Sequence, residues 1–366
     1  MTIEWIDSEN SGSPNLLSSR DALSAGHCDE GTAAAITGIL AGLEQGRTDA
    51  AGTLEKLQVL LEQIRHTPNG IARVSRMNAF VRTLGRADNL AFFLELMRKS
   101  LKSARLSDRK IAERSRAGLT HCLYGWVGQS HVLYSERSPL PSTTLAGNEV
   151  EDHMGYPVAE WHASIHIWQP NPDARAFESL KRFEPGVLVE PPHSHPFSFV
   201  SYVSIGAMRE SIYQETSAPA SAGSADRYQD VDLERVDGVW PPHREYVRRR
   251  LRTVEDRVDL VQGQSYFMSP DMIHDVEVDR ATSVDRPAIT LFLCSETTQV
   301  PNSYMVPSMA EFHRGHPDLT RQGKALDLEE WDAKLDATAR YLRGETDYLR
   351  LGEIVKCGSS YAFMNQ

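Results

Sequence analysis

The hexapeptide PPHSHP, residues 191–196, places two histidines two positions apart in a region where apolar and polar residues alternate. Successive side chains of an extended strand point to opposite faces, so His193 and His195 share one face if this segment is extended. Imidazole is a common nitrogen ligand of first-row transition metals. The pair therefore supplies two candidate ligands for a metal ion.

A third candidate lies in the stretch GQSYFMSPDMIH, residues 263–274. The stretch combines a short apolar strand, a turn marked by Pro270 and a histidine at the start of the next strand. An isolated His-x-His pair is more often two surface or hydrogen-bonded histidines than a metal site. Because a third histidine follows in the same β-rich region, the pattern favours a metal centre made of His193, His195 and His274.

The region from 161 to 296 is predicted to consist mainly of β-strands. β-Branched and aromatic residues alternate with polar ones between Pro and Gly breaks, and many short strands in succession are typical of an antiparallel sandwich or barrel. The segment 217–238 is rich in small and charged residues, so we interpret 216–245 as an insertion and a candidate lid. The expected strands are 162–168, 186–191, 198–206, 208–215, 256–261, 265–269, 274–279 and 288–294.

Helical periodicity lies on both sides of this β-rich region. Apolar residues recur three and four positions apart between about 29 and 116, which predicts about four amphipathic helices. A further helix is expected from Leu328 to Gly344, with Asp327 and Glu330 as its capping box. We therefore expect four parts, which are a flexible tail (1–20), a helical domain (21–130), a barrel (145–305) and a C-terminal helical extension (306–366).

Composition and charge argue against several classes of partner. The 366 residues include 39 basic and 50 acidic side chains, for a formal net charge of −11, which gives no general attraction for nucleic acid or anionic membranes. No apolar run is long enough to cross a bilayer, the first residues lack the features of a secretory signal, and the four cysteines lie far apart. We therefore expect a cytoplasmic protein that binds a small-molecule substrate and neither nucleic acid nor membrane, with a homodimer left open.

The two histidine segments resemble the two characteristic motifs of the cupin superfamily. Gly186-(x6)-His193-Ser-His195 resembles the first motif, and Gly263-(x6)-Pro270-(x3)-His274 resembles the second. The resemblance covers roughly residues 160–296. It implies an α+β fold in which a cupin jelly-roll β-barrel, also called a double-stranded β-helix, holds one metal. Here the barrel would be joined to an N-terminal helical region and to C-terminal helices.

Within this superfamily, the first motif usually carries a glutamate four or five residues after its second histidine, where this chain has Phe199 and Val200. A site of three histidines is similar to that of the thiol dioxygenases, the cysteine dioxygenase-like branch. The resemblance implies Fe(II) as the metal, with the three histidines as its ligands and O₂ as co-substrate. This chain departs from that branch on the last strand, where Thr290, Phe292 and Cys294 stand in place of Ser, His and Tyr.

Three neutral imidazoles leave Fe(II) with its full charge and with open coordination positions, which suits the binding of O₂ beside an anionic or chelating substrate. We therefore expect a mononuclear non-haem Fe(II) dioxygenase that acts on a small thiol, an amino acid or a related nitrogen compound. Mn, Ni and Zn also accept imidazole ligands. A non-redox metal enzyme (a lyase, isomerase or hydrolase) and a non-catalytic ligand-binding cupin therefore remain as alternatives.

Six further residues are candidates for contact with the substrate. Thr290, Phe292 and Cys294 share one face if strand 288–294 is regular. His166 lies on strand 162–168, and Arg182 is a candidate anchor for an anion. Regular alternation would turn Tyr202 away from the histidine pair, but a bulge near Pro196 would turn it inward.

Overall fold

The structure is a computed structural model in which thirteen stretches of the chain are described. The tail expected over 1–20 and the candidate anchor Arg182 lie outside them. None of the helices in these stretches combines the length and the apolar character needed to cross a lipid bilayer. The described residues are 28–68, 70–101, 120–121, 127–134, 161–169, 187–195, 197–216, 228–236, 244–297, 303–305, 328–351, 354–357 and 360–363.

The long helices form where the apolar periodicity predicts them, whereas the short helix at 280–285 is not predicted. Asp29 accepts a hydrogen bond from the backbone N–H of Thr32 and caps the first helix, and Asp49 caps the second in the same way. Beyond the last long helix, Gly344 adopts φ of +69°, as the sequence leads us to expect. The described helices are α1 (Glu30–Glu44), α2 (Ala50–Arg65), α3 (Ile71–Leu84), α4 (Ala87–Leu101), α6 (Arg280–Asp285) and α8 (Leu328–Leu342).

The strands form two larger antiparallel sheets and a small hairpin of β13 (Ile354–Cys357) and β14 (Ser360–Phe363). The first sheet has the order β1 (Thr120–His121), β2 (Val127–Tyr134), β3 (His162–Trp168), β11 (Ala288–Thr297), β5 (Phe197–Ile205) and β9 (Ser265–Met268). The second closes on itself in the order β10 (Ile273–Asp279), β4 (Val187–His193), β12 (Ser303–Met305), β7 (Tyr228–Val236), β8 (Arg244–Val261) and β6 (Ala207–Glu215). The expected α+β fold with a jelly-roll barrel is confirmed.

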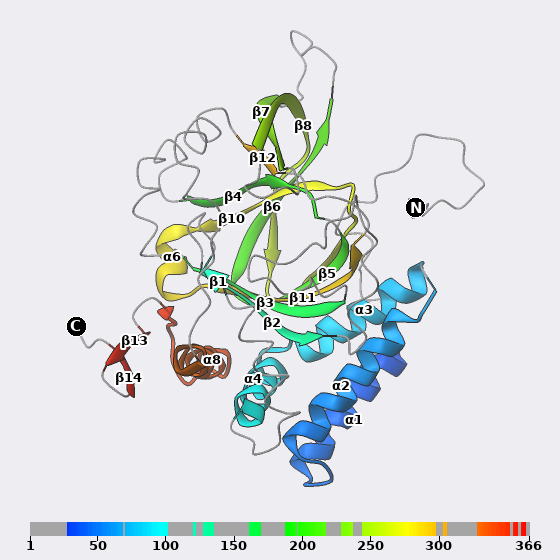
Figure 1. The fold of residues 1–366 in the computed structure, drawn as a ribbon, viewed down its shortest axis with the longest axis vertical. Helices are drawn as coiled ribbons and strands as arrows, with labels where there is room; N and C mark the ends of the chain where they lie inside the picture. The colour runs from blue at the N-terminus through cyan, green and yellow to red at the C-terminus, as the bar shows by residue number, and fades with distance from the viewer. Residues whose placement is uncertain are drawn as a thin grey trace.

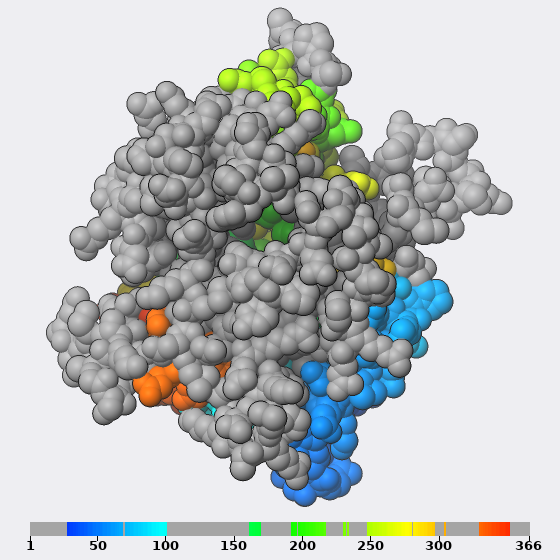
Figure 2. Space-filling view, viewed as in Figure 1, coloured from blue at the N-terminus to red at the C-terminus, as the bar shows by residue number. Residues whose placement is uncertain are grey.

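Apart from α6, which follows β10, the described helices lie on the outer side of the first sheet, so the molecule has a helical layer, the first sheet and then the closed barrel (Figure 1). Ile165, Val200 and Leu291 from that face share one hydrophobic core with Phe80 and Trp331 from the helices. The helical region is therefore one layer of a common core. Strand β2 also crosses the boundary that we expected at residue 130 and pairs with β3. Figure 2 shows α1 and α2, in blue, at the surface on one side of the molecule.

The expected insertion and candidate lid, 216–245, contains a strand that the sequence analysis does not predict. Residues 228–236 form strand β7 and pair with both β8 and β12. Val231 and Leu233 are buried whereas Asp230 is exposed, so the segment alternates as a strand does. The charged residues between the apolar ones concealed this alternation. The rest of the expected insertion includes 217–227 and 237–243, which lie outside the described residues.

Strand β10 belongs to two interiors at once. His274, Val276 and Val278 face the first sheet, and the two valines pack in one core with Phe199 and Phe292. Ile273, on the opposite face, packs in a separate core inside the closed barrel with residues from β7, β8 and β12. The space between the first sheet and the β4–β10–β6 wall is where the histidines lie. We call this space the inter-sheet chamber.

Candidate metal centre

Strand pairing brings the three predicted histidines together. His193 is the last residue of β4, and His195 follows two positions later on the same face. Strand β10 pairs with β4 in an antiparallel register that places His274 directly opposite His193. The two histidine segments are about eighty residues apart in sequence, and this register alone makes them neighbours.

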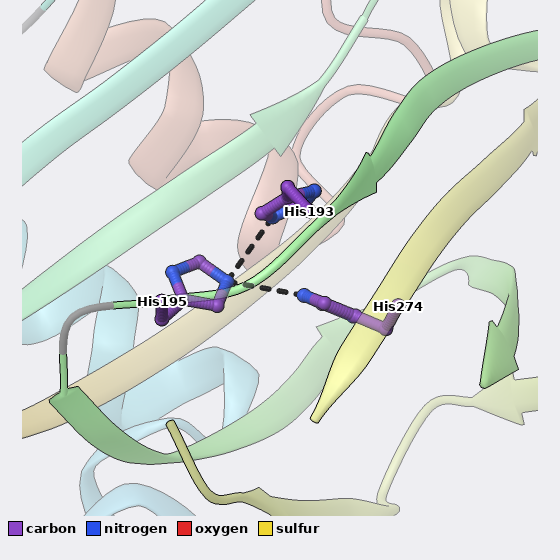
Figure 3. Close-up of side chains that lie close together, drawn as sticks. All are labelled: His193, His195 and His274. Carbon is purple, nitrogen blue, oxygen red and sulfur yellow. Dashed lines mark hydrogen bonds between the residues drawn. The ribbon is translucent and has the colours of Figure 1, made fainter. Parts of the chain in front are cut away.

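The three imidazoles point toward one another (Figure 3). The Nε2 atom of His195 lies 3.1 Å from Nε2 of His193 and 3.0 Å from Nε2 of His274. All three ligand atoms lie within 4.8 Å of one another, and no other such cluster of His, Cys, Asp or Glu side chains occurs within the described stretches. His274 is only 3% exposed, and the other two are half-buried.

These separations fit a metal ion. Three imidazole nitrogens this close together could each reach one metal ion, because metal–imidazole bonds are about 2.0–2.1 Å long. His193, His195 and His274 could therefore hold a single ion.

The protonation of the rings leads to the same conclusion. The Nδ1 atom of His274 lies 2.7 Å from Oε1 of Glu210, so Nδ1–H donates to the carboxylate and Nε2 keeps its lone pair. Burial lowers the pKa of His274, and burial together with His193 and His274 lowers the pKa of His195. A neutral ring whose Nε2 lone pair points at the other two histidines can serve as a ligand of a divalent metal placed between them.

Aromatic side chains surround the triad inside the chamber. The ring of Phe197 stacks on His195 with centroids 5.4 Å apart, and Phe199 lies edge-on to His195 at 4.7 Å. Phe292 lies 4.6 Å from Phe199 and 6.3 Å from His195. These rings make the surroundings of the histidines apolar, which strengthens electrostatic interactions there.

Four of the six candidate substrate residues lie on this inner face. Thr290, Phe292 and Cys294 alternate along β11, and their partners on β3 are His166, Ser164 and His162. His166 stacks on Phe292 at 5.1 Å, and Sγ of Cys294 lies 3.0 Å from Nδ1 of His162. The hydroxyl oxygens of Ser164 and Thr290 are buried and make no hydrogen bond among the described residues.

Tyr202 does not face the chamber. Its ring packs in the helix-side core, where the Arg82 guanidinium lies 5.8 Å from its centre. A Cβ added to Gly85, just after α3, would come within 2.7 Å of that ring, so the tyrosine is enclosed by the helices. Alternation along β5 continues through residues 199–203 without reversal, so the expectation that Tyr202 contacts substrate is wrong.

Glu210 is the residue that sequence reasoning missed. It lies on β6, fifteen residues beyond His195, and no motif relates it to the histidines. The only signal was an acidic residue at alternate spacing with Met208 and Ile212, both of which are buried in the chamber. A carboxylate on an otherwise apolar face of a strand indicates a buried partner.

No family model matches the sequence, and no curated protein is similar to it. Two similar solved structures are cupin proteins. Oxalate decarboxylase from Bacillus subtilis at pH 4.6 is 15% identical, with a TM-score of 0.20 over 43% of this chain and 28% of that one. The 11S globulin from Wrightia tinctoria is 13% identical, with a TM-score of 0.21 over 50% and 30%.

The chain spans less than a third of the length of either structure. The fold and the site are therefore described from the strand order and the three histidines of this chain alone. What the structure shows directly is a closed antiparallel barrel beside a six-stranded sheet, with three convergent histidines that form a candidate metal centre.

Proposed function

We propose that this protein is a mononuclear non-haem Fe(II)-dependent dioxygenase of the three-histidine cupin type. The observation that carries the proposal is the convergence of three Nε2 atoms on one point, with no carboxylate oxygen in the cluster formed by the described residues. A ligand set of neutral imidazoles leaves the metal with its full charge and with open positions for two further ligands.

The chain's own residues would divide the work as follows. His193, His195 and His274 would hold the metal, which when bound supplies electron transfer between an organic substrate and O₂. Phe197, Phe199 and Phe292 exclude water from the chamber and keep the histidines neutral.

The wall opposite the triad would bind the substrate, which we propose is a small thiol, an amino acid or a related nitrogen compound. The buried hydroxyls of Ser164 and Thr290 are available to hydrogen-bond its polar atoms. His166 lies two residues beyond Ser164 on β3 and directly opposite Thr290. Its pKa is lowered to about 3, mainly by burial, so it is neutral at pH 7. A neutral imidazole can either donate or accept a hydrogen bond.

The test is metal analysis followed by an oxygen electrode. Protein purified without added metal or chelator is expected to contain iron at close to one atom per chain. Oxygen uptake should begin only when a substrate is added from a panel of thiols and amino acids. The matched control is the same protein reloaded with Zn(II), which cannot exchange electrons and should consume no oxygen.

Three results would overturn this proposal. Turnover without oxygen uptake by the manganese, nickel or zinc form would identify a non-redox metal enzyme. Binding of a small molecule without any product would identify a ligand-binding cupin. Failure of the purified protein to take up Fe(II) would remove the metal centre itself.

A further inference from the structure

We infer that Glu210 is a positioning residue for the metal centre, which fixes the ring of His274 and sets how tightly the triad binds a metal. The inference rests on the proposed metal site and goes beyond it, because it assigns a role to a residue outside the ligand cluster. It concerns the far side of the His274 ring, away from the point where the three Nε2 atoms meet.

The sheet register places Glu210 within reach of this ring. Strand β6 pairs with β10 so that Ile212 lies opposite His274 and Glu210 lies opposite Val276. Glu210 is therefore the diagonal neighbour of His274 on the same face, at a separation that long side chains span. The side chains of Glu210 and His274 are each only 3% exposed. Both ends of the contact are thus held by two adjacent strands, on the face that lines the inter-sheet chamber.

The geometry of the contact shows that Glu210 orients His274 and is not itself placed as a metal ligand. Oε1 of Glu210 lies 2.7 Å from Nδ1 of His274, whereas Nε2 of the same ring points to His195 at 3.0 Å. Because the two ring nitrogens point in different directions, this carboxylate oxygen does not lie among the ligand atoms. The bond instead fixes which nitrogen carries the proton, prevents rotation of the ring and raises the electron donation of Nε2.

A merely structural role for Glu210 makes a different prediction. A buried carboxylate needs a partner, and His274 would satisfy that need without any effect on metal binding. In that case removal of Glu210 would lower the stability of the apoprotein but leave the metal affinity unchanged. Metal affinity, measured separately from stability, therefore distinguishes the two roles.

The experiment titrates metal-free protein with Co(II), whose visible absorption reports binding, in the wild type, Glu210→Gln and Glu210→Ala. Outer partners of histidine ligands are typically worth about 10–100-fold in metal affinity, so we expect a loss of that size in Glu210→Ala. Glutamine retains an oxygen that accepts from Nδ1–H, so Glu210→Gln should lose clearly less affinity than Glu210→Ala. Thermal unfolding of each metal-free variant reports stability separately.

A matched control removes a different buried carboxylate from the same wall. Glu277 lies on β10, is 7% exposed and pairs with Arg257 at 3.3 Å, away from the triad. Glu277→Ala should bind Co(II) as the wild type does. A second readout is the proton spectrum of the Co(II) protein, in which the Nδ1–H of His274 should give a shifted resonance. That resonance should persist in Glu210→Gln and be lost through fast exchange with water in Glu210→Ala.

The outcomes distinguish this inference from the proposed function. If Glu210→Ala binds Co(II) as tightly as the wild type and keeps the resonance, the inference is overturned while the metal centre stands. If that variant does not fold, Glu210→Gln decides, and wild-type affinity in Glu210→Gln would overturn the inference. If the wild type itself binds no Co(II), the proposed centre fails and the inference fails with it.

Discussion

Arg73 of α3 and Glu296 of β11 are 223 positions apart in the sequence, yet Nη1 of Arg73 lies 2.9 Å from Oε1 of Glu296. The second carboxylate oxygen of Glu296 accepts a hydrogen bond of 2.9 Å from Nε1 of Trp161, which immediately precedes β3. The Arg73 guanidinium also lies 5.4 Å from the centre of the Trp161 ring. One carboxylate thus joins the helical layer to two strands of the first sheet.

We predict that Glu296→Ala lowers the free energy of unfolding by about 1–3 kcal/mol, because the buried Nε1–H of Trp161 and one nitrogen of Arg73 lose their acceptor. The other Arg73 nitrogens keep their hydrogen bonds to the backbone carbonyls of Thr67 and Arg65. Urea denaturation would measure the change, and a double-mutant cycle with Arg73→Ala would isolate the pair. Arg286 and Asp347 offer a control, since they are 3.9 Å apart with side chains 64% and 83% exposed. Loss of that pair should cost less than about 0.5 kcal/mol. Equal effects at the two places would contradict the interpretation.

His195→Ala is the sharpest substitution within the triad. His195 contacts both of the other ligands, and its removal does not leave the Glu210 carboxylate without His274. We expect the variant to fold and to lose its metal, because two imidazoles hold a divalent ion far less tightly than three. Metal analysis after dialysis would measure the content. His66→Ala, at an exposed position beyond α2, should keep its metal. Full metal content in His195→Ala would show that the ion is bound elsewhere.

Cys294 is predicted to resist alkylation in the folded protein. Its side chain is fully buried, and burial raises the pKa of its thiol far above the ordinary value. Because only the thiolate reacts, iodoacetamide at pH 8 should leave Cys294 unmodified until the protein is denatured. Peptide mass mapping would follow the reaction, with the half-buried Cys28 as the internal reference. Modification of Cys294 as fast as Cys28 would place it on an accessible surface.

The cap of α1 should make stability depend on pH. The backbone N–H of Thr32 donates to Asp29 at 2.7 Å, and this hydrogen bonding lowers the pKa of the carboxyl group. A lowered folded-state pKa means that its contribution is present above the ordinary Asp pKa and is lost as the pH falls through the folded value.

We therefore expect Asp29→Ala to cost about 1 kcal/mol at pH 7. The difference from the wild type should shrink below about pH 4. Urea denaturation at several pH values would show this convergence. Asp29→Asn, which keeps an acceptor without the charge, should change stability little at any pH. A constant cost of Asp29→Ala from pH 7 to pH 3 would contradict the assignment.

The sequence allowed the triad and the strands that carry it to be predicted, because two alternating histidines and one histidine after a turn are local patterns. Glu210 could not be predicted, since it lies 64 positions from His274 and meets it only through the register of β6 against β10. The error for Tyr202 has a similar origin. A local pattern shows that residues alternate, but the helices that pack on one face decide which side becomes the interior.

Strand β7 was not predicted from the sequence because of its charged residues. Val231 and Leu233 are buried in the small core of the closed barrel, yet acidic residues flank each of them. The high content of charged residues suggested a solvated loop. A half-exposed strand can have the same composition, so composition alone does not distinguish the two. The pairing with β8 and β12 shows that the segment is a strand, and the exposed Asp230 next to the buried Val231 shows its alternation.

Strand β10 contributes residues to two cores, so its alignment with the neighbouring strands is fixed on both faces. Shifting this strand by one residue along its neighbours would exchange its two faces, so Asp275 would enter the chamber in place of His274. Asp275 instead accepts a hydrogen bond of 2.6 Å from the Tyr213 hydroxyl in the native register. A misaligned β10 would lose this hydrogen bond and would bury the Asp275 carboxylate among the phenylalanines of the chamber. The three histidines can therefore come together only when β10 is correctly aligned, because only that alignment buries the apolar residues of β10 in both cores.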